Sequence, residues 1–512
     1  MDADRSDDEA LGHPGPSRVV IAARDGSGGH NAAETIRPGR FSGRSGYPDP
    51  MATSITFLGA ARTVTGSAYL VDSGRSQVMV DFGMFQGRKE VRQRNWVDPE
   101  FPAPHVEAVV LTHTHIDHIG RIPRLVANGF KGPIFCTPPT IELAEVLLKD
   151  AAHLQMEDAE YLNRKGLTSH KPAVPLFDDK DVESALKLFV SVPLGKLHNA
   201  APGISFSFRE AGHLLGASSV DMTVEGGGSS RRILFSGDLG RYNAVLANDP
   251  APCPDADYVV VESTYGNRQH PVISVQEQLL SVLTRTFARG GILLIPAFAV
   301  GRAQQMIWLM DRLVHEQKMR PFPIYIDSPM AVDATRIYAR HGEALKDALT
   351  LVGGQSVLNS KWVRLARSRQ ESEALNKLKG PAVIISSSGM LSGGRILHHC
   401  RVRLPHAENT LLITGYQGEG TLGRRLIDKA TTVRIHKTEI PVLAEVTDLK
   451  GLSGHADVNE LMRWMSEVKT PPRKVFVTHG EEDAALALCA RIAEERGFAT
   501  HAPRHVERVM LD

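Results

Sequence analysis

The sequence has few cysteines and no long apolar run. The four cysteines are widely spaced and form no CxxC pair; they are Cys136, Cys253, Cys400 and Cys489. This argues against both a disulfide scaffold and a structural zinc finger, and we expect a reducing, cytoplasmic environment. The longest apolar run, 292–300, is interrupted by Pro296 and is too short to cross a bilayer as a helix. We therefore expect no membrane partner.

The sequence also has almost no net charge, because 59 Lys and Arg stand against 58 Asp and Glu. Such a balance creates no overall field that would collect a polyanion over the whole surface. Any nucleic acid must then be held by a local site. A chain of 512 residues with 42% apolar residues suits more than one hydrophobic core. We expect two large domains.

The first part of the chain differs from the rest. Residues 1–52 alternate charged residues with Gly and Pro and contain no sustained apolar stretch. Both a secretory signal and a folded core require such a stretch. The composition predicts a disordered N-terminal tail without export, ahead of a first domain segment at 53–240.

Short β-rich segments open this first segment, at Ile55–Leu58 and Val78–Val80, and Val106–Leu111 predicts a further buried strand. Pro138 and Pro139 suit the first turn of a helix, and periodic apolar residues continue it to Leu162. The pattern predicts a sheet covered by helices.

After Asp238 strands alternate with helices, which is typical of a parallel α/β domain, and we assign it to 241–428. Its expected elements are Tyr258–Val261, Val275–Phe287, Ile292–Ile295, Ala303–Leu313, Ile324–Ile326 and Val383–Ile385. A strand at 474–477 and a helix at 483–496 follow, and 429–512 is expected to complete the first domain.

The strongest chemical signal is HTHIDH at 113–118, which places three imidazoles and a carboxylate directly after a predicted buried strand. Convergent imidazole and carboxylate groups suit zinc. Two further segments present one ligand each between glycines, His213 in GHLLG and Asp238 in SGDLG. Either residue alone is more often an ordinary loop residue. Together with 113–118, however, they complete a ligand set.

HTHIDH (113–118), AGHLLGA (211–217) and FSGDLG (235–240) resemble the successive metal motifs of the metallo-β-lactamase superfamily. The resemblance implies a four-layer αββα sandwich. Three later motifs resemble the β-CASP group of nucleic-acid-processing enzymes within that superfamily: VESTYG at 261–266, SGHAD at 453–457 and VTHGE at 477–481. The expected architecture is then an α/β chain, an αββα sandwich with an inserted parallel α/β β-CASP domain.

The resemblance implies two zinc ions as cofactors. The implied ligands are His113, His115 and His213 for one ion, Asp117, His118 and His479 for the other, and Asp238 as a bridge. Two such metals hold a hydroxide between them and stabilise the charge of an in-line phosphoryl displacement. The implied catalytic residues are Asp117, Glu262 and His455, with His455 as the general acid.

A glycine- and serine-rich segment, SSSGMLSGGR at 386–395, follows a predicted strand, and similar loops line the substrate groove of β-CASP nucleases. Its exposed N–H groups suit a phosphate, although a plain tight turn is the alternative. It lacks the GK[ST] ending of a nucleotide-binding loop. The predicted substrate contacts are Ser388, Gly389, Arg395 and Arg302.

The favoured function is a ribonuclease acting on single-stranded RNA, and whether it acts as an endonuclease or also as a 5′-exonuclease stays open. Alternatives are a DNA-processing nuclease, whose third β-CASP motif typically carries valine where this chain has His479, and a small-molecule metallo-hydrolase, which needs no large insert. A scaffold subunit without metals is disfavoured because every expected ligand is present. RNA is the expected partner, and a homodimer is left open.

Overall fold

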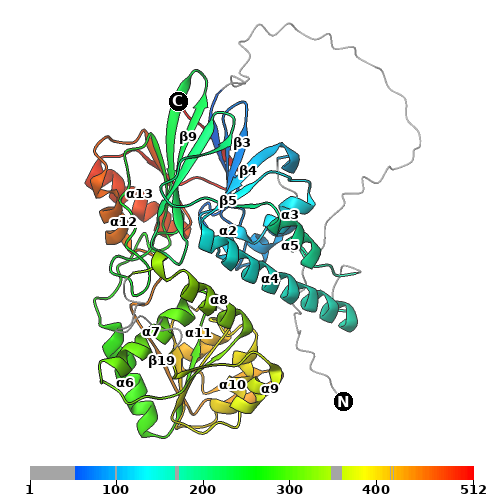
Figure 1. Ribbon diagram of the computed structural model, residues 1–512, viewed down its shortest axis with the longest axis vertical. Helices are drawn as coiled ribbons and strands as arrows, with labels where there is room; N and C mark the ends of the chain where they lie inside the picture. Colours follow the sequence, from blue (N-terminus) through cyan, green and yellow to red (C-terminus); the bar gives the residue numbers. More distant parts are fainter. Residues whose placement is uncertain (1–51, 98–100, 168–171, 347–359, 416, 419) are drawn as a thin grey trace, which may run out of the picture.

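The computed structural model describes residues 52–97, 101–167, 172–346, 360–415, 417–418 and 420–512 (Figure 1). Apart from Ala52, the tail predicted at 1–52 lies outside these residues. The described chain forms two seven-stranded sheets, a six-stranded sheet and a two-stranded hairpin. Within these ranges, no helix combines the length and the hydropathy that a membrane span requires.

The first seven-stranded sheet, sheet A, collects strands from both ends of the chain. Its order is β22 (Glu507–Met510), β1 (Ser54–Phe57), β2 (Tyr69–Asp72), β3 (Gln77–Val80), β4 (Val106–Val110), β5 (Ile134–Cys136) and β6 (Phe189–Ser191). Pairing is antiparallel from β22 to β3 and parallel from β3 to β6. The last strand of the chain therefore lies beside the first.

The second sheet, sheet B, also combines early and late strands. Its order is β21 (Thr500–His501), β20 (Lys474–Thr478), β11 (Tyr258–Glu262), β10 (Ser229–Phe235), β9 (Ser218–Gly226), β8 (Ile204–Glu210) and β7 (His198–Ala201). β9 and β10 form a hairpin whose turn residues, Gly227 and Gly228, both have positive φ. Glycine adopts this conformation without steric cost.

Alternating side chains give each of these sheets two apolar faces. In β3, Val78 and Val80 belong to the core between sheets A and B, whereas Met79 belongs to a core on the other side of sheet A. In β11, Val260 faces the shared core and Val261 faces outward. A sheet that is apolar on both faces must be covered on both. Each outer face therefore requires helices.

Helices supply these outer layers, which confirms the predicted αββα sandwich. Those associated with sheet A are α2 (Ile116–Ile119), α3 (Ile122–Ala127), α4 (Pro138–Lys165) and α5 (Asp179–Leu186). Those that cover sheet B are α12 (Val458–Trp464) and α13 (Glu482–Arg496). The short helix α1 (Lys89–Gln93) buries none of its residues. The predicted long helix corresponds to α4, which has both prolines in its first turn and ends at Gly166 with φ 62°.

The insert is built on a six-stranded sheet, sheet C, in which every pair is parallel. Its order is β14 (Val363–Leu365), β13 (Ile324–Asp327), β15 (Ala382–Ser386), β12 (Ile292–Pro296), β16 (Thr410–Ile413) and β19 (Glu445–Asp448). The helices are α6 (Val275–Ala288), α7 (Arg302–His315), α8 (Pro329–Arg340), α9 (Arg369–Leu375), α10 (Arg395–Arg403) and α11 (Leu422–Ile427). A separate hairpin joins β17 (Thr432–Ile435) to β18 (Thr438–Pro441). This confirms the predicted parallel α/β insert.

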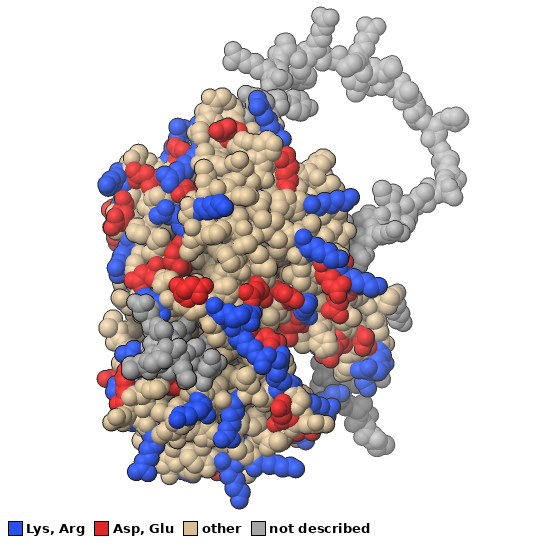
Figure 2. Space-filling model, viewed as in Figure 1, with Lys and Arg blue, Asp and Glu red and all other residues tan. Residues whose placement is uncertain are grey.

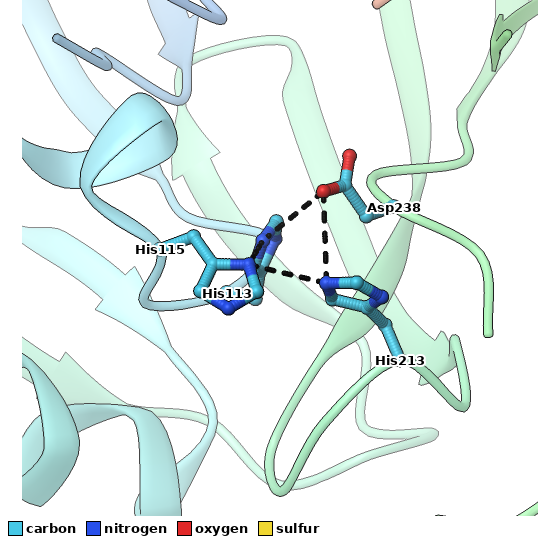
Figure 3. Close-up of side chains that lie close together, drawn as sticks. All are labelled: His113, His115, His213 and Asp238. Atoms are coloured by element: carbon cyan, nitrogen blue, oxygen red, sulfur yellow. Dashed lines mark hydrogen bonds and ion pairs between the residues drawn. The ribbon is translucent and has the colours of Figure 1, made fainter. Parts of the chain in front are cut away.

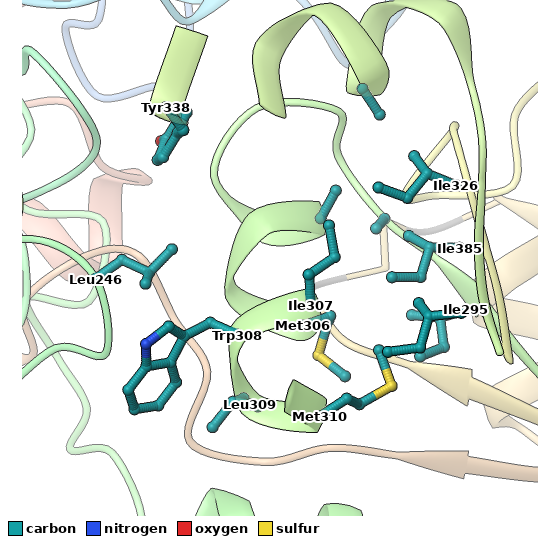
Figure 4. Packing of buried hydrophobic residues seen from close by; sticks show 14 of the residues in the cluster. Leu246, Ile295, Met306, Ile307, Trp308, Leu309, Met310, Ile326, Tyr338 and Ile385 are labelled. Atoms are coloured by element: carbon teal, nitrogen blue, oxygen red, sulfur yellow. The ribbon is translucent and has the colours of Figure 1, made fainter. Parts of the chain in front are cut away.

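Side chains that alternate between the two faces of sheet C also explain the two cores of the insert. Leu293 and Ile295 of β12 face the core beneath α7, and Ile292 and Leu294 face the core on the other side. Figure 4 shows Met306 and other α7 side chains packed toward strand residues of sheet C.

Strand pairing differs from the predicted domain ranges at both ends of the insert. Tyr258–Val261 was assigned to the insert, but β11 pairs with β10 and β20 in sheet B. Residues after 428 were assigned to the first domain, but β19 pairs with β16 in sheet C. Periodicity shows that a segment is a strand and does not show which sheet it joins. We therefore propose that the insert spans about 263–449 rather than 241–428.

The insert packs directly on the sandwich. Leu214 and Leu215, from the loop that carries His213, share a hydrophobic cluster with α7 and α8. The N–H of Leu215 donates to the hydroxyl of Tyr338 over 3.3 Å, and that hydroxyl lies 3.8 Å from where a Cβ of Gly301 would be. The loop that follows β12 is therefore held next to the His213 loop.

Candidate active site

The loop after β4 carries four of the predicted ligands. His115 is the N-cap of the short helix α2, which places Asp117 in its first turn and His118 in its last. The neighbouring backbone fixes this loop, because the N–H of Phe82 donates to the carbonyl of His118 over 2.8 Å. A Cβ on Gly83 would lie 1.5 Å from the carbonyl oxygen of Asp117. Only glycine permits this approach.

One group of ligands converges at the end of sheets A and B, where His113, His115 and His213 meet Asp238 (Figure 3). Nδ1 of His115 lies 3.1 Å from Nε2 of His113 and 3.1 Å from Nε2 of His213. Oδ2 of Asp238 is 3.4 Å from Nε2 of His113. A tetrahedral zinc with Zn–N bonds of about 2.0–2.1 Å separates its ligand nitrogens by roughly 3.3 Å. The four groups fit one such ion.

A second group lies directly beside the first. Nε2 of His118 is 3.1 Å from Nε2 of His479, which is 3.5 Å from Oδ2 of Asp117. Oδ1 of Asp238 lies 3.3 Å from Nε2 of His118. The donor set of two imidazoles and two carboxylates again suits zinc.

Asp238 connects the two groups, with Oδ2 facing the first and Oδ1 facing the second. Its side chain is buried, and Oδ1 has no hydrogen-bond partner among the described residues. Burial opposes ionisation, but the surrounding histidines hold the pKa of Asp238 well below its usual value. A cation beside this buried, ionised oxygen would stabilise it. The residues present therefore fit two bound metals.

The first group is in the protonation state that metal binding needs. Burial lowers the pKa of His113 to about 3 and that of His115 to about 4, and it also lowers the pKa of His213. All three are neutral at neutral pH, with a lone pair available. Nδ1 of His213 lies 2.9 Å from the carbonyl of Gly454, so that nitrogen carries the proton and Nε2 faces Asp238.

His118 is oriented in a comparable way by Asp81. Its Nδ1 lies 2.7 Å from Oδ2 of Asp81, which leaves Nε2 for the second group. Burial lowers the pKa of His118, but the charges of Asp238 and Asp81 outweigh this and raise the pKa well above its ordinary value. The metal-free site therefore binds a proton at this imidazole, and a cation at Nε2 would replace it.

Glu262 and His455 form a pair at the edge of the metal-ligand groups. Nδ1 of His455 is 3.2 Å from each carboxylate oxygen of Glu262, and 3.8 Å from Oδ2 of Asp238. Burial lowers the pKa of His455, but the charges of Glu262 and Asp238 outweigh this and raise it to about 9. Its side chain is 20% exposed, whereas Glu262 is buried.

The same pair could by geometry hold a cation together with Asp238. However, Oε1 of Glu262 accepts the N–H of Leu239 over 2.7 Å, and Oε2 accepts that of Thr264 over 3.3 Å. Both oxygens are thus engaged by backbone as well as by His455. This favours hydrogen bonding rather than metal binding as the function of Glu262.

The predicted substrate residues lie in the insert. Ser388 and Gly389 follow the carboxyl end of β15, and Arg302 is the first residue of α7. Burial lowers the pKa of Arg302 to about 10, and its buried Nε has no hydrogen-bond partner among the described residues. Arg395 is engaged differently, because it pairs with Asp327 over 2.8 Å and donates to two backbone carbonyls.

Three family models match this chain in succession. The metallo-β-lactamase superfamily model matches residues 61–268, the β-CASP domain model matches 303–426, and the Zn-dependent metallo-hydrolase RNA specificity domain model matches 439–503. The chain is 38% identical over 434 residues to Ribonuclease TTHA0252 of Thermus thermophilus, covering 84% of this chain and 94% of that protein. It belongs to the β-CASP group of the metallo-β-lactamase superfamily.

Other comparisons agree with this assignment. The transcription termination factor FttA of Methanosarcina mazei is 30% identical over 471 residues, which cover 89% of this chain and 71% of that protein. A solved structure of a protein of unknown function from Enterococcus faecalis covers 90% of this chain and 100% of its own, with a TM-score of 0.52 and 14% identity. At that identity the likeness concerns the fold alone.

This β-CASP chain brings the seven predicted ligands into two adjoining groups, with Glu262 and His455 beside them. Two residues beside the ligands were not predicted: Asp81, which orients His118, and Thr264, whose hydroxyl lies 3.1 Å from Nδ1 of His479. Asp81 did carry a signal, since it follows a buried strand as Asp238 does. Thr264 carried no signal of its own beyond its place in the motif VESTYG.

Proposed function

We propose that this chain is a zinc-dependent ribonuclease that hydrolyses phosphodiester bonds of single-stranded RNA. The observation that carries the proposal is the position of Asp238, whose two oxygens face two separate groups of metal-binding side chains. Two-metal centres of this kind suit displacement at phosphorus. The name of the Thermus relative and the RNA specificity model support RNA as the substrate.

The proposed cofactors are two zinc ions, held by the seven ligands named above. When bound, they supply positive charge that activates water and stabilises the charge developing on the phosphoryl oxygens. The chain's own contribution is to hold neutral imidazoles and ionised carboxylates in place. Asp117 contributes as a ligand of the second group and as a carboxylate at the reacting centre.

His455 is the proposed general acid. Hydrolysis leaves a 3′-oxygen that needs a proton, and an imidazole near the reacting centre can supply it. Glu262 accepts from Nδ1 of His455, so that Nε2 is directed away from the carboxylate. The carboxylate also favours the protonated imidazole. Glu262 is thus a positioning residue for His455.

The groove for the RNA backbone is proposed to lie between the insert and the sandwich. Ser388 and Gly389 would receive a phosphate with their N–H groups, and Arg302 would supply positive charge. Arg395, which follows the same loop in the chain, pairs with Asp327. The proposal covers endonuclease action and, where a 5′ end enters the groove, exonuclease action. A homodimer is compatible with it.

The decisive experiment compares matched nucleic acids. Purified, metal-analysed protein is incubated with end-labelled single-stranded RNA and with DNA of the same sequence. The proposal expects strong preference for RNA, because a protein distinguishes the two through the 2′-hydroxyl. Equal cleavage of both would favour a DNA-processing nuclease. Turnover restricted to a thioester or lactone would favour a small-molecule hydrolase, and absence of zinc from an intact protein would favour a scaffold.

A further inference from the structure

One aromatic ring is exposed in an otherwise buried segment between β12 and α7. Every other residue from 291 to 300 is buried, including Ala297 and Ala299 on either side, whereas Phe298 is 47% exposed. Isolated exposed apolar side chains are common on protein surfaces. The position and the neighbours of Phe298 are what distinguish it.

Phe298 lies at the carboxyl end of sheet C, where loops from three adjacent strands meet. β12 pairs with β15 on one side and with β16 on the other. The N–H of Ala297 donates to the carbonyl of Ser386 over 3.1 Å, and the carbonyl of Phe298 accepts the N–H of Ala303 over 3.2 Å. Ligands of parallel α/β sheets bind at this edge.

Two glycines allow the ring to lie against backbone. A Cβ on Gly389 would be 3.2 Å from Cδ2 and Cε2 of Phe298, and one on Gly415 would be 4.0 Å from Cε2. The buried side chain of Gln417 joins these two loops, since its Nε2 donates to the carbonyl of Gly389 over 2.9 Å and to that of Gly415 over 3.3 Å. The ring therefore rests on a braced surface beside the predicted phosphate loop.

Positive charge and the active site both lie near this ring. Arg302 is four residues further along the chain and begins α7. A Cβ on Gly301, just before it, would lie 3.8 Å from the hydroxyl of Tyr338, which accepts the N–H of Leu215 in the His213 loop. The segment that carries Phe298 and Arg302 therefore lies next to a loop of the metal-ligand groups.

The insert as a whole carries the charge that attracts a nucleic acid. Residues 263–449 contain 24 Lys and Arg against 15 Asp and Glu, a formal net charge of +9, although the complete chain carries only +1. Figure 2 shows Lys and Arg side chains spread over the insert, in the lower half of the view. A polyanion is therefore attracted to this domain rather than to the sandwich.

We propose that Phe298 is a stacking platform for one unpaired RNA base, next to the phosphate that Arg302 and the Ser388–Gly389 loop receive. The inference rests on the proposed ribonuclease function and deepens it. Aromatic side chains stack on unpaired bases without regard to sequence, because every base has an aromatic face. A base inside a duplex is covered by its stacked neighbours. The platform therefore gives a reason for a preference for single strands.

The test is single-turnover cleavage of an end-labelled RNA with one cleavage site, over a range of enzyme concentrations. A series of RNAs carries one abasic nucleotide at successive positions. For the wild-type enzyme, loss of the base at one fixed distance from the cleavage site should raise the half-saturating concentration. Phe298→Ala should bind the intact RNA about 5- to 150-fold more weakly and be insensitive to the abasic nucleotide at that position.

Two further variants separate stacking from other effects. Phe298→Trp should keep near wild-type affinity and the same abasic position, because it retains an aromatic face. Tyr161→Ala removes an aromatic side chain of similar exposure, 42%, from α4 and should change nothing. Thermal unfolding and zinc content should be unaltered in Phe298→Ala.

The outcomes distinguish this inference from the function on which it rests. If the wild type cleaves RNA but Phe298→Ala binds it equally well, or still loses affinity at the same abasic position, the stacking role is wrong and the ribonuclease proposal stands. If the metal-replete wild type cleaves no RNA, both fail.

Discussion

Nδ1 of His455 lies 3.2 Å from both carboxylate oxygens of Glu262. The carboxylate of Glu262 is buried, whereas the imidazole of His455 is 20% exposed. A proton donor at the edge of a metal centre needs this arrangement, because the carboxylate both orients the ring and stabilises its charged form.

His455→Ala should retain both zinc ions and the fold while losing roughly 10²–10⁴-fold in cleavage rate, the usual contribution of a general acid. Elemental analysis and single-turnover rates check this. His153→Ala, which removes an exposed histidine from α4, is the matched control. Loss of zinc in His455→Ala would show that the residue is a ligand, and a normal rate would remove it from the mechanism.

The Glu262→Ala defect should be related, and the double variant should be no worse than the poorer single variant. Residues that act as one unit give non-additive effects. If the fold-losses in rate of the two single variants multiply in the double variant, the two side chains act independently.

Glu262→Gln should move the alkaline limb of the rate profile to lower pH. In the metal-free chain the carboxylate helps to raise the pKa of His455 to about 9, above its ordinary 6.5, so the protonated donor is lost as pH rises through the raised value. Bound cations oppose protonation, and the limb of the metal-bound enzyme lies lower. Removing the charge of Glu262 lowers the pKa of His455, and with it the alkaline limb, further. A pH profile with an unmoved alkaline limb would contradict the pairing.

Asp238→Ala should lose zinc from both groups together with activity, because the two oxygens of this carboxylate face both. Metal analysis after gel filtration provides the measurement. Asp333→Ala removes a partly exposed carboxylate from α8, distant in sequence from the ligands, and should retain both ions. Retention of two zinc ions by Asp238→Ala would refute the bridging role.

Asp81→Asn should weaken zinc binding about 10- to 100-fold, the typical effect of removing the partner that orients a histidine ligand. Excess zinc should therefore restore cleavage. Competition with a chelator measures the change in affinity. Unchanged affinity would mean that the 2.7 Å contact between Asp81 and His118 does not orient the imidazole.

Asp327→Ala should lower the free energy of unfolding by about 3–5 kcal/mol, because it leaves buried partners of a charge uncompensated. Asp327 is buried and contacts His399 over 2.6 Å and Arg395 over 2.8 Å. Denaturant unfolding compared with Asp333→Ala measures the difference. Equal stability of the two variants would show that this network does not support the insert.

Much of the metal centre could be predicted from the sequence because its ligands are concentrated at strand ends. Four of them occupy 113–118 directly after β4, and Asp238 follows β10 between glycines. The local pattern showed a candidate ligand at each strand end, whereas β4 belongs to sheet A and β10 to sheet B, so the packing of the two sheets brings these residues together. The pairing of His455 with Glu262 joins residues 193 positions apart, and only the resemblance to a known family suggested it.

The remaining features depended on contacts that no local pattern reports. His479 and Asp81 adopt left-handed backbone conformations, with φ of 49° and 55°, because the surrounding chain holds them there. Pairing with β10 and β20 decided the sheet to which β11 belongs. Arg395 is engaged by the carboxylate of Asp327, which is 68 residues away in the chain.

The sequence by itself determined the candidate metal ligands, the alternation of strands and helices in the insert and the family, since each is encoded in residue types at short spacing. The tertiary structure alone decided the edges of the insert, the orientation of His118 by Asp81 and the exposure of Phe298. These depend on which distant segments come to lie against a residue. Phe298 occurs in a run as apolar as a buried strand, yet the fold leaves its ring 47% exposed and lying against the glycines of two other loops.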